Sequence, residues 1–509
     1  MKILVSILIF YILPVFPQQL YEKQIIPFDG LDSDWFGRSV AVSDSFLFIG
    51  SLRYSNPVEN AVYVYRIENN EYNFEYKLFP SDSQTGIFGA LFGSRLLVIG
   101  DELFVGAQNK RVNNNPVGAL YVFEYKNYKW IEKQKIVPPE PHTYSELFSN
   151  AISKYNDYLL VSAFRAYAGN IRSGKVFLYK YQDNKYELFQ EFTPFDAKED
   201  QSFGTNVIIK DDLIFIGSSN DSTESGFGSG SIYVYDRKDS LWEFSRKYIP
   251  QPNSANLAFG CAMALNNNYV FIGTSDNLSY FEPGEVYIYK YDDSNLSLVQ
   301  IIESGDNYFD DRFGISLFAN DDSLLVSAIF DSVKNNTPGA VYLFVNEKGN
   351  WVKHSKIVPS DEINTVWFGG KCIAKNDKIY IAAHLTKIGN IRPGVVYIYS
   401  KNPLSIFDDI TLEPTNFKLS QNYPNPFNSK TNIDFYLPHR ARIIIRIFNI
   451  VGQEIKTVLD QIKESNYYSI SLDFDDLSSG IYFYSMEYFF EENNKKKHST
   501  ITKKAVLIK

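Results

Sequence analysis

One pattern recurs seven times along the chain and restricts the folds open to it. Each copy begins with a phenylalanine, usually followed by glycine, and successive copies are about 55 residues apart. The phenylalanines are Phe36, Phe92, Phe148, Phe203, Phe259, Phe313 and Phe368. Fourteen positions after them, an apolar run ends on a small residue: Gly50, Gly106, Ser162, Gly217, Gly273, Ser327 or Ala382. An offset that holds through seven copies marks a structural repeat.

Each copy contains short apolar runs rich in β-branched and aromatic residues, separated by Gly, Asn, Asp and Pro, and these features predict strands. The second run, such as LIFIGS at 213–218, is apolar on both faces, so it must lie between other sheets. Four strands in a repeat of this length are typical of a propeller blade. A series of separate β-sandwiches is excluded because each copy is too short to hold its own core. We therefore predict an all-β chain with a seven-bladed β-propeller.

The fourth, outer run of the repeat occurs in six copies, for example KYIP at 247–250, and the seventh copy lacks it. A run of the same kind, KQIIP at 23–27, stands near the N-terminus. We expect the propeller to span residues 19–402 and strand 23–27 to complete the last blade, which would leave no open sheet edge there.

Composition supports this class and excludes another. Aromatic residues make up 16% of the chain, a usage typical of strands. The net charge is −9 and no basic stripe is present, so the chain lacks the cationic surface that a nucleic-acid binder needs.

The N-terminus and the cysteines bear on the cellular compartment. Residues 1–18 carry one lysine and then an apolar run from Ile3 to about Val15, which predicts a signal peptide. No later stretch reaches the roughly 18 apolar residues of a bilayer span. Cys261 and Cys372 fall in non-adjacent copies, so we expect two buried free thiols rather than a disulfide.

The repeat resembles the FG-GAP family, whose propeller repeats also occur in integrin α subunits. The resemblance rests on segments such as FGRSVAVSDSFLFIGS and FGTNVIIKDDLIFIGS, followed by Gly-x-x-Tyr-x-Tyr strands, and it covers roughly residues 20–400. Many members of that family hold calcium in a loop of alternating aspartates. This chain has no Asp-x-Asp-x-Asp-Gly run, so we expect no metal and no cofactor.

The periodicity disappears after a linker at 403–416, and residues 417–509 alternate as a small Ig-like β-sandwich would. Segments such as QNYPNPFN, IFNIVGQEI and LSSGIYFY closely resemble the type A C-terminal sorting domain of the type IX secretion system of Bacteroidetes-like bacteria. The resemblance implies recognition by that machinery and delivery to the outer cell surface or the medium. The motif residues are Asn422, Tyr423, Pro424, Asn425, Pro426, Phe427 and Asn428, with turn glycines Gly452 and Gly480.

Catalytic signatures are missing from the sequence. The five histidines are scattered without metal-ligand spacing, and neither a nucleophile elbow nor a phosphate loop is present. Since propeller enzymes draw carboxylates from separate blades, a polysaccharide-active glycosidase or lyase remains an alternative.

A binding surface is expected on one face of the propeller, where the loops entering the first strands meet the loops between the second and third strands. Arginine and aromatic side chains suit a polar protein or glycan partner there. The candidate ligand-binding residues are Trp35, Arg53, Arg111, Arg165, Tyr167, Arg172, Trp367 and Arg392. We thus expect a secreted or cell-surface binding or adhesion module. A structural surface protein without a specific ligand is the other alternative.

Overall fold

The structure is a computed structural model, and it describes residues 20–27, 29–52, 60–82, 89–139, 146–250, 257–274, 284–292, 295–305, 311–332, 338–360, 365–401, 417–419, 422, 427–437, 440–464, 466–492 and 495–509. The expected signal peptide 1–18, the linker 403–416, Arg53 and residues 423–426 lie outside this part. The chain divides into two compact units, Met1–Pro403 and Leu404–Lys509. None of the described segments is a helix with the length and apolar character needed to cross a bilayer.

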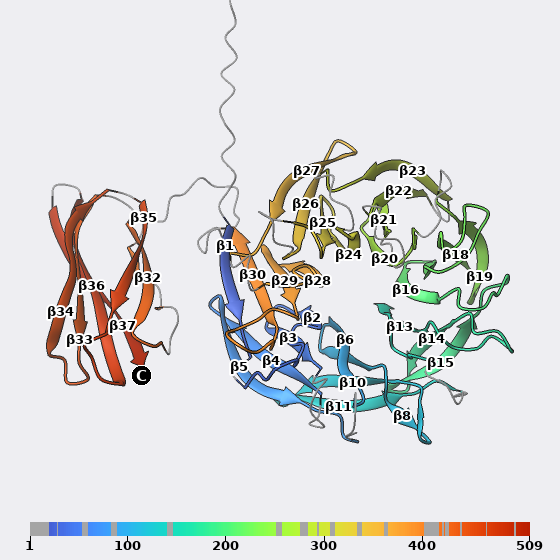
Figure 1. The fold of residues 1–509 in the computed structure, drawn as a ribbon, viewed down its shortest axis with the longest axis horizontal. Coiled ribbons are helices and arrows are strands. Elements are labelled where there is room, and N and C mark those ends of the chain that lie inside the picture. The colour runs from blue at the N-terminus through green and yellow to red at the C-terminus, as the bar shows by residue number, and fades with distance from the viewer. Residues whose placement is uncertain are drawn as a thin grey trace, which may run out of the picture. The chain divides into compact units, whose positions relative to one another are not determined.

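In its described residues the first unit consists of seven four-stranded antiparallel sheets arranged in a ring (Figure 1). The prediction of an all-β propeller is confirmed. The first strand of each sheet lies nearest the centre of the ring and the fourth lies outermost (Figure 1). We number the sheets as blades 1 to 7 by their first strands. The strands are, in blade 1, β2 (Ser39–Val42), β3 (Phe46–Ser51), β4 (Ala61–Glu68) and β5 (Glu71–Leu78); in blade 2, β6 (Phe92–Ile99), β7 (Glu102–Ala107), β10 (Ala119–Lys126) and β11 (Lys129–Ile136); in blade 3, β12 (Ile152–Tyr155), β13 (Tyr158–Ala163), β14 (Lys175–Gln182) and β15 (Lys185–Phe192); in blade 4, β16 (Phe203–Lys210), β17 (Leu213–Ser218), β18 (Ser231–Lys238) and β19 (Leu241–Tyr248); in blade 5, β20 (Ala262–Leu265), β21 (Tyr269–Gly273), β22 (Val286–Asp292) and β23 (Asn295–Ile302); in blade 6, β24 (Phe313–Ala319), β25 (Ser323–Ala328), β26 (Ala340–Glu347) and β27 (Asn350–Ile357); and in blade 7, β28 (Lys371–Lys375), β29 (Lys378–Ala383), β30 (Val395–Lys401) and β1 (Leu20–Ile25). A short hairpin, β8 (Arg111–Val112) with β9 (Asn115–Pro116), extends from blade 2.

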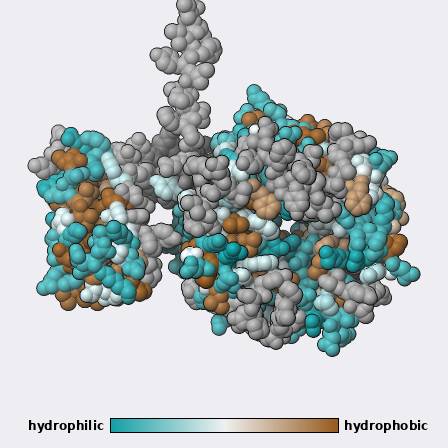
Figure 2. Space-filling view, in the orientation of Figure 1, coloured by the Kyte–Doolittle hydropathy of each residue, from teal (hydrophilic) through white to brown (hydrophobic). Residues whose placement is uncertain are grey.

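The hydrophobic cores lie between neighbouring blades. The second strands are buried along almost their whole length; every residue of β3, for example, is buried. Tryptophans on outer strands close these cores against the preceding blade. Trp130 of β11 packs edge-on against Phe48 of blade 1 at 5.1 Å between ring centroids, and Trp351 of β27 packs in the same way against Phe271 of blade 5 at 4.8 Å. On the face seen in Figure 2, hydrophilic side chains cover most of the described propeller surface and apolar residues form small separate groups.

Contacts between blades explain why a glycine precedes the third strand in most copies of the repeat. The backbone N–H of Phe203 in blade 4 donates to the carbonyl of Ser173 in blade 3 at 2.8 Å. Gly174 has a φ of +102°, and a Cβ atom on it would lie 2.1 Å from the carbonyl oxygen of Phe203. A side chain there would clash with the next blade and would also strain the backbone. In six of the seven copies, the glycine that precedes the third strand is therefore required by the joint between two blades. Blade 1 has Asn60 there instead, and its side chain accepts a hydrogen bond from the N–H of Leu91 at 2.9 Å.

Blade 7 takes its outer strand from the start of the chain. β1 pairs antiparallel with β30, from Leu20 opposite Lys401 to Ile25 opposite Val396. Phe36 of blade 1 forms the usual joint with blade 7, because its N–H donates to the carbonyl of Pro393 at 2.8 Å. The first and last parts of the propeller sequence are thus held together by a strand pair and by a blade joint.

Both cysteines are free thiols. Cys372 on β28 is fully buried, and its Sγ accepts a hydrogen bond from Ser327 at 3.3 Å. Cys261 is only partly buried, which corrects the expectation of two buried thiols. Cys261 directly precedes β20 and packs at the edge of the core between blades 5 and 6.

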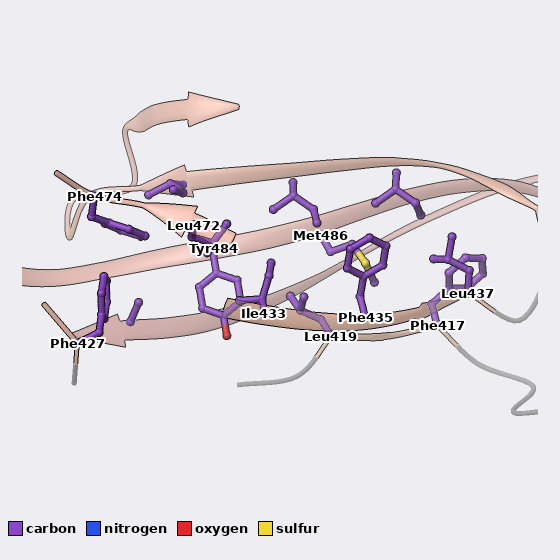
Figure 3. Packing of buried hydrophobic residues seen from close by; sticks show 14 of the residues in the cluster. Phe417, Leu419, Phe427, Ile433, Phe435, Leu437, Leu472, Phe474, Tyr484 and Met486 are labelled. Carbon is purple, nitrogen blue, oxygen red and sulfur yellow. The ribbon is translucent and has the colours of Figure 1, made fainter. Parts of the chain in front are cut away.

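The second unit is a sandwich of two antiparallel sheets. One sheet contains β31 (Lys418–Leu419), β32 (Lys430–Leu437) and β35 (Asn466–Asp473), and the other contains β34 (Glu454–Lys463), β33 (Ala441–Phe448), β36 (Gly480–Glu492) and β37 (Lys495–Leu507). Figure 3 shows the core, in which Ile433, Phe435 and Leu437 are alternate residues of β32. They pack with Tyr484 and Met486 of β36. This period of two is typical of a strand with one buried face.

Candidate functional site

The chain topology gathers two sets of loops on one face of the propeller, which we call the loop face. In an up-and-down antiparallel sheet, the loop that enters the first strand lies at the same end as the loop between the second and third strands. Backbone hydrogen bonds join these loops across blades; for example, Ser33 donates to the carbonyl of Arg392 at 3.1 Å. In the described residues, blades 7 and 1 therefore build their part of the loop face together.

Two tryptophans predicted from the sequence meet on this face. Trp367 of blade 7 and Trp35 of blade 1 both contact His384, which follows β29, with ring centroids at 5.2 Å and 5.7 Å respectively. Phe330 of blade 6 continues the contact, with its ring 5.9 Å from Trp367. We call Phe330, Trp367, His384 and Trp35 the aromatic row. The row crosses three blades, and its members other than His384 are half-buried.

Both tryptophans have a left-handed backbone conformation. Their φ angles are 46° for Trp35 and 59° for Trp367, values that are uncommon for a bulky residue. The carbonyl of each tryptophan accepts a hydrogen bond of 3.0 Å from the backbone N–H three residues later, that of Arg38 or Gly370. The same positive φ occurs in every copy of the repeat, at Trp35, Leu91, Leu147, Ser202, Ala258, Arg312 and Trp367. The fold therefore requires this backbone turn in every blade, but it does not require the tryptophan side chain found in blades 7 and 1.

His384 is the polar member of the row. It is 2% exposed, and its Nδ1 atom has no hydrogen-bond partner among the described residues. Burial and the positive charge of Arg38 lower the pKa of His384 to about 3. The imidazole is therefore neutral at neutral pH and keeps a nitrogen that can bond to a ligand or a water molecule.

Arg392 lies at the joint beside Trp35. Its backbone N–H donates to the Asp32 carboxylate at 2.9 Å, and its side chain is exposed. The structure thus brings three predicted residues, Trp35, Trp367 and Arg392, to the joints around blade 7.

The other predicted residues lie on blades 2 and 3. The guanidinium of Arg172 donates two hydrogen bonds of 2.7 Å to the carboxylate of Asp200, so this arginine ties blade 3 to blade 4. Arg165 is exposed and lies over the ring of Phe164 at 5.6 Å, and Tyr167 is half-buried in the same loop. Arg111 is exposed on the hairpin of β8 and β9. These residues lie on blades 2 and 3, whereas the aromatic row lies on blades 6, 7 and 1.

Several acidic residues near the loop face have structural partners. Asp196 accepts hydrogen bonds from Tyr233 on the third strand and from Lys247 on the outer strand, the latter at 2.6 Å. The same trio of aspartate, tyrosine and lysine recurs as Asp29–Tyr63–Lys77, Asp82–Tyr121–Lys135 and Asp331–Tyr342–Lys356. These carboxylates neutralise outer-strand lysines; three of them fix loops that lead from one blade to the next or into blade 1, whereas Asp331 fixes the loop between the second and third strands of blade 6. Across the described ranges, no three His, Cys, Asp or Glu side chains come together as metal ligands would.

The sequence reasoning missed His384 and Phe330. His384 stands sixteen positions after Phe368, where blades 1, 2 and 3 have Leu52, Gln108 and Phe164. An alignment of the seven copies would have marked it as the one histidine at this repeat position. Its contact with Trp35 depends on ring closure and could not be seen from sequence spacing.

In the second unit, the described motif residues stabilise the sandwich. Asn422 is buried and donates a hydrogen bond to the Thr431 hydroxyl at 3.0 Å. Phe427 packs edge-on against Phe474, with ring centroids 4.8 Å apart (Figure 3). Gly452 has a φ of +82° in the turn between β33 and β34. Asn428 is exposed and Gly480 begins β36.

Comparisons with known proteins match both units. The model of the FG-GAP repeat family matches residues 21–65 and 186–235, and the model of the secretion system C-terminal sorting domain matches residues 421–507. No curated protein matches the chain. Among solved structures, Sqt1 from Chaetomium thermophilum is 13% identical with a TM-score of 0.44, covering 75% of this chain and 91% of that one. The β-propeller domain of the Trilobed protease from Pyrococcus furiosus is 11% identical with a TM-score of 0.38, covering 68% of this chain and 90% of that one.

The two family-model matches confirm the two resemblances seen in the sequence. A sorting domain of this kind is handled by the type IX secretion system, which delivers its cargo to the cell surface or outside the cell. The chain therefore carries FG-GAP repeats on a β-propeller together with a C-terminal sorting domain of the type IX secretion system.

Proposed function

We propose that this exported protein is a binding module and that it holds an extracellular glycan on the loop face, against the aromatic row. The sorting domain supports a role at or beyond the cell surface. The aromatic row supports the position of the site, because half-buried rings on adjacent blades offer flat apolar faces with polar edges. The C–H faces of a sugar ring stack on such surfaces, while Arg392 and His384 supply hydrogen-bonding groups at the edge.

The observation that carries the proposal is that the fold does not require tryptophan at these two positions. At the same place in the repeat, the other blades have residues as small as Ser202 and Ala258 with the same backbone conformation. Trp35 and Trp367 therefore add aromatic surface that the blade joint can do without. Aromatic side chains that remain partly accessible are enriched where proteins bind partners.

Binding of the full-length protein to an array of extracellular polysaccharides and oligosaccharides tests the proposal. For a glycan that binds, a concentration of a hundred times the dissociation constant stabilises the folded state by about 2.7 kcal/mol, which a thermal shift detects. The variant with Trp35→Ser and Trp367→Ala copies the residues of blades 4 and 5 and should lose this shift.

Tyr128→Ser is a matched control. Tyr128 is 84% exposed in the turn between β10 and β11, at the opposite face of the propeller. Its replacement removes an exposed aromatic ring without touching the row, so glycan binding should be unchanged. Equal glycan affinity in the wild type and the tryptophan double variant would refute the site.

A further inference from the structure

The strands that surround the centre of the ring carry positive charge only. The seven inner strands β2, β6, β12, β16, β20, β24 and β28 contain no aspartate and no glutamate. Their basic residues are Arg95, Lys154, Lys210, Lys371 and Lys375, and Arg38 directly precedes β2. This concentration of cations stands out in a chain whose net charge is −9.

The basic residues at the end away from the loop face have partners. Lys375 forms an ion pair of 2.9 Å with Asp44, and Lys154 lies 3.7 Å from a carboxylate oxygen of Glu102. Lys154 and Lys375 are thus balanced by acidic residues, Glu102 at the start of β7 and Asp44 in the turn before β3. Lys210 at the same end donates instead to the carbonyl of Asn266 and to the side chain of Asn267.

The basic residues at the loop-face end lack such partners. Among the described residues, Arg38, Arg95 and Lys371 form no ion pair. Arg95 donates its hydrogen bonds only to the carbonyl oxygens of Asn150 and Ser94. The three side chains come from adjacent blades 1, 2 and 7 and are half-buried. We call them the axial cations.

The axial cations repel one another. Burial and the charge of Arg38 lower the pKa of Arg95, and burial together with the charge of Arg95 lowers the pKa of Lys371. For Lys371 the neighbouring Cys372 opposes this lowering of the pKa, but no carboxylate among the described residues opposes it for either group. Partly buried charges without a counter-charge are costly to the folded state, and a bound anion would relieve that cost.

The axial cations are linked to the aromatic row by the backbone. Arg38 is bonded through its N–H to the carbonyl of Trp35, and Lys371 follows Gly370, which bonds in the same way to Trp367. Each of these two cations therefore stands one turn after a tryptophan of the row. Arg38 and Lys371 therefore add positive charge beside the row, which also has the guanidinium of Arg312 over the ring of Phe330 at 4.7 Å.

We propose that Arg38, Arg95 and Lys371 form an anion site and that this site takes the carboxylate of an acidic sugar whose ring lies against the aromatic row. Two guanidinium groups suit a carboxylate because each can donate two parallel hydrogen bonds to its oxygens. The sugar part of this inference rests on the proposed glycan site, whereas the anion site depends only on the axial cations.

Binding of sodium glucuronate to the full-length protein tests the inference, with glucose as the neutral control and chloride used to hold the ionic strength constant. Glucuronate should raise the unfolding midpoint in a saturable way, and glucose at the same concentration should raise it less. Arg38→Gln and Lys371→Gln should each weaken glucuronate binding at least tenfold. Lys375→Gln is the matched control, because Lys375 lies on the same strand as Lys371 but is paired with Asp44.

The stability of the unliganded variants separates binding from a structural role. Lys371→Gln removes an uncompensated charge, so its midpoint without ligand should equal or exceed that of the wild type, whereas loss of a structural lysine would lower it. Unchanged glucuronate affinity in Arg38→Gln and Lys371→Gln would overturn the anion site. A response to sulfate or to a short polyglutamate peptide but not to glucuronate would overturn the sugar assignment. If the tryptophan double variant keeps glycan binding while Lys371→Gln loses the glucuronate response, the aromatic site fails and the anion site stands.

Discussion

Replacing His384 with leucine should make the propeller less sensitive to acid. His384 has a pKa of about 3 in the folded protein, against 6.5 for an unperturbed histidine. Between these values the unfolded chain binds a proton that the folded chain excludes, so stability is lost as the pH falls below about 6.5. Each pH unit in this window costs about 1.4 kcal/mol, which gives about 2 kcal/mol at pH 5 and about 3 kcal/mol at pH 4. Above pH 7 the contribution vanishes because the imidazole is neutral in both states.

Urea unfolding followed by tryptophan fluorescence measures this effect in the propeller alone, because all five tryptophans of the chain precede the linker. Leucine is a suitable replacement since blade 1 has the buried Leu52 at the same repeat position. The difference in unfolding free energy between pH 7 and pH 5 should be about 2 kcal/mol smaller in His384→Leu than in the wild type. His354→Gln, at an exposed histidine of β27, is the matched control. Parallel pH profiles for His384→Leu and the wild type would refute the reasoning.

Three further predictions follow from the blade joints, the ring closure and the sorting domain. Gly174→Ala should destabilise the propeller by more than about 3 kcal/mol, because left-handed strain adds to a clash with Phe203. Gly169→Ala, with a φ of +64° and nothing within 4 Å of the added Cβ, should cost only about 1 kcal/mol in the same urea experiment. Deletion of Leu20–Ile25 should leave β30 as an open sheet edge. The variant should then associate, as measured by light scattering, and its unfolding transition in urea, followed by fluorescence, should be broader. An unfolding transition as sharp as that of the wild type would contradict closure by β1. Truncation after Pro403 should retain the protein inside a host with type IX secretion, and recovery of that variant from the medium on fractionation would contradict the role of the tail.

The sequence predicted the propeller because each repeat feature answers a steric demand. Gly50 ends an apolar run where a Cβ atom would lie 2.1 Å from the carbonyl oxygen of Gly93 in the next blade. The alternating tyrosines of the third strand are buried between blades, and Tyr63 is also held by Asp29. These steric requirements are the same in each blade, so the residues that meet them recur at a fixed period in the sequence. Blade 3 is an exception at the residue after the repeat's phenylalanine. Ser149 follows Phe148 there, with a φ of 70°, where the other blades have glycine.

The site was only partly predictable because its residues break the repeat. Trp35 and Trp367 were selected as aromatic residues entering the first strands, but nothing in their sequence separation showed that they share a histidine. Arg38 and Lys371 lie in segments that the pattern assigned to the scaffold, where a basic residue carries no obvious signal. Their proximity arises from closure of the ring, which brings residues from opposite ends of the propeller sequence into one cluster.

The pairing of β1 with β30 also has a consequence for the order of folding. β1 is synthesised first, whereas its partner is the last strand of the propeller to be made. Until then β1 has no sheet to join, and blades 1 and 7 cannot form their shared joint. Since pairing of segments so distant in the chain is slow, closure of the ring is expected to be a late step in folding.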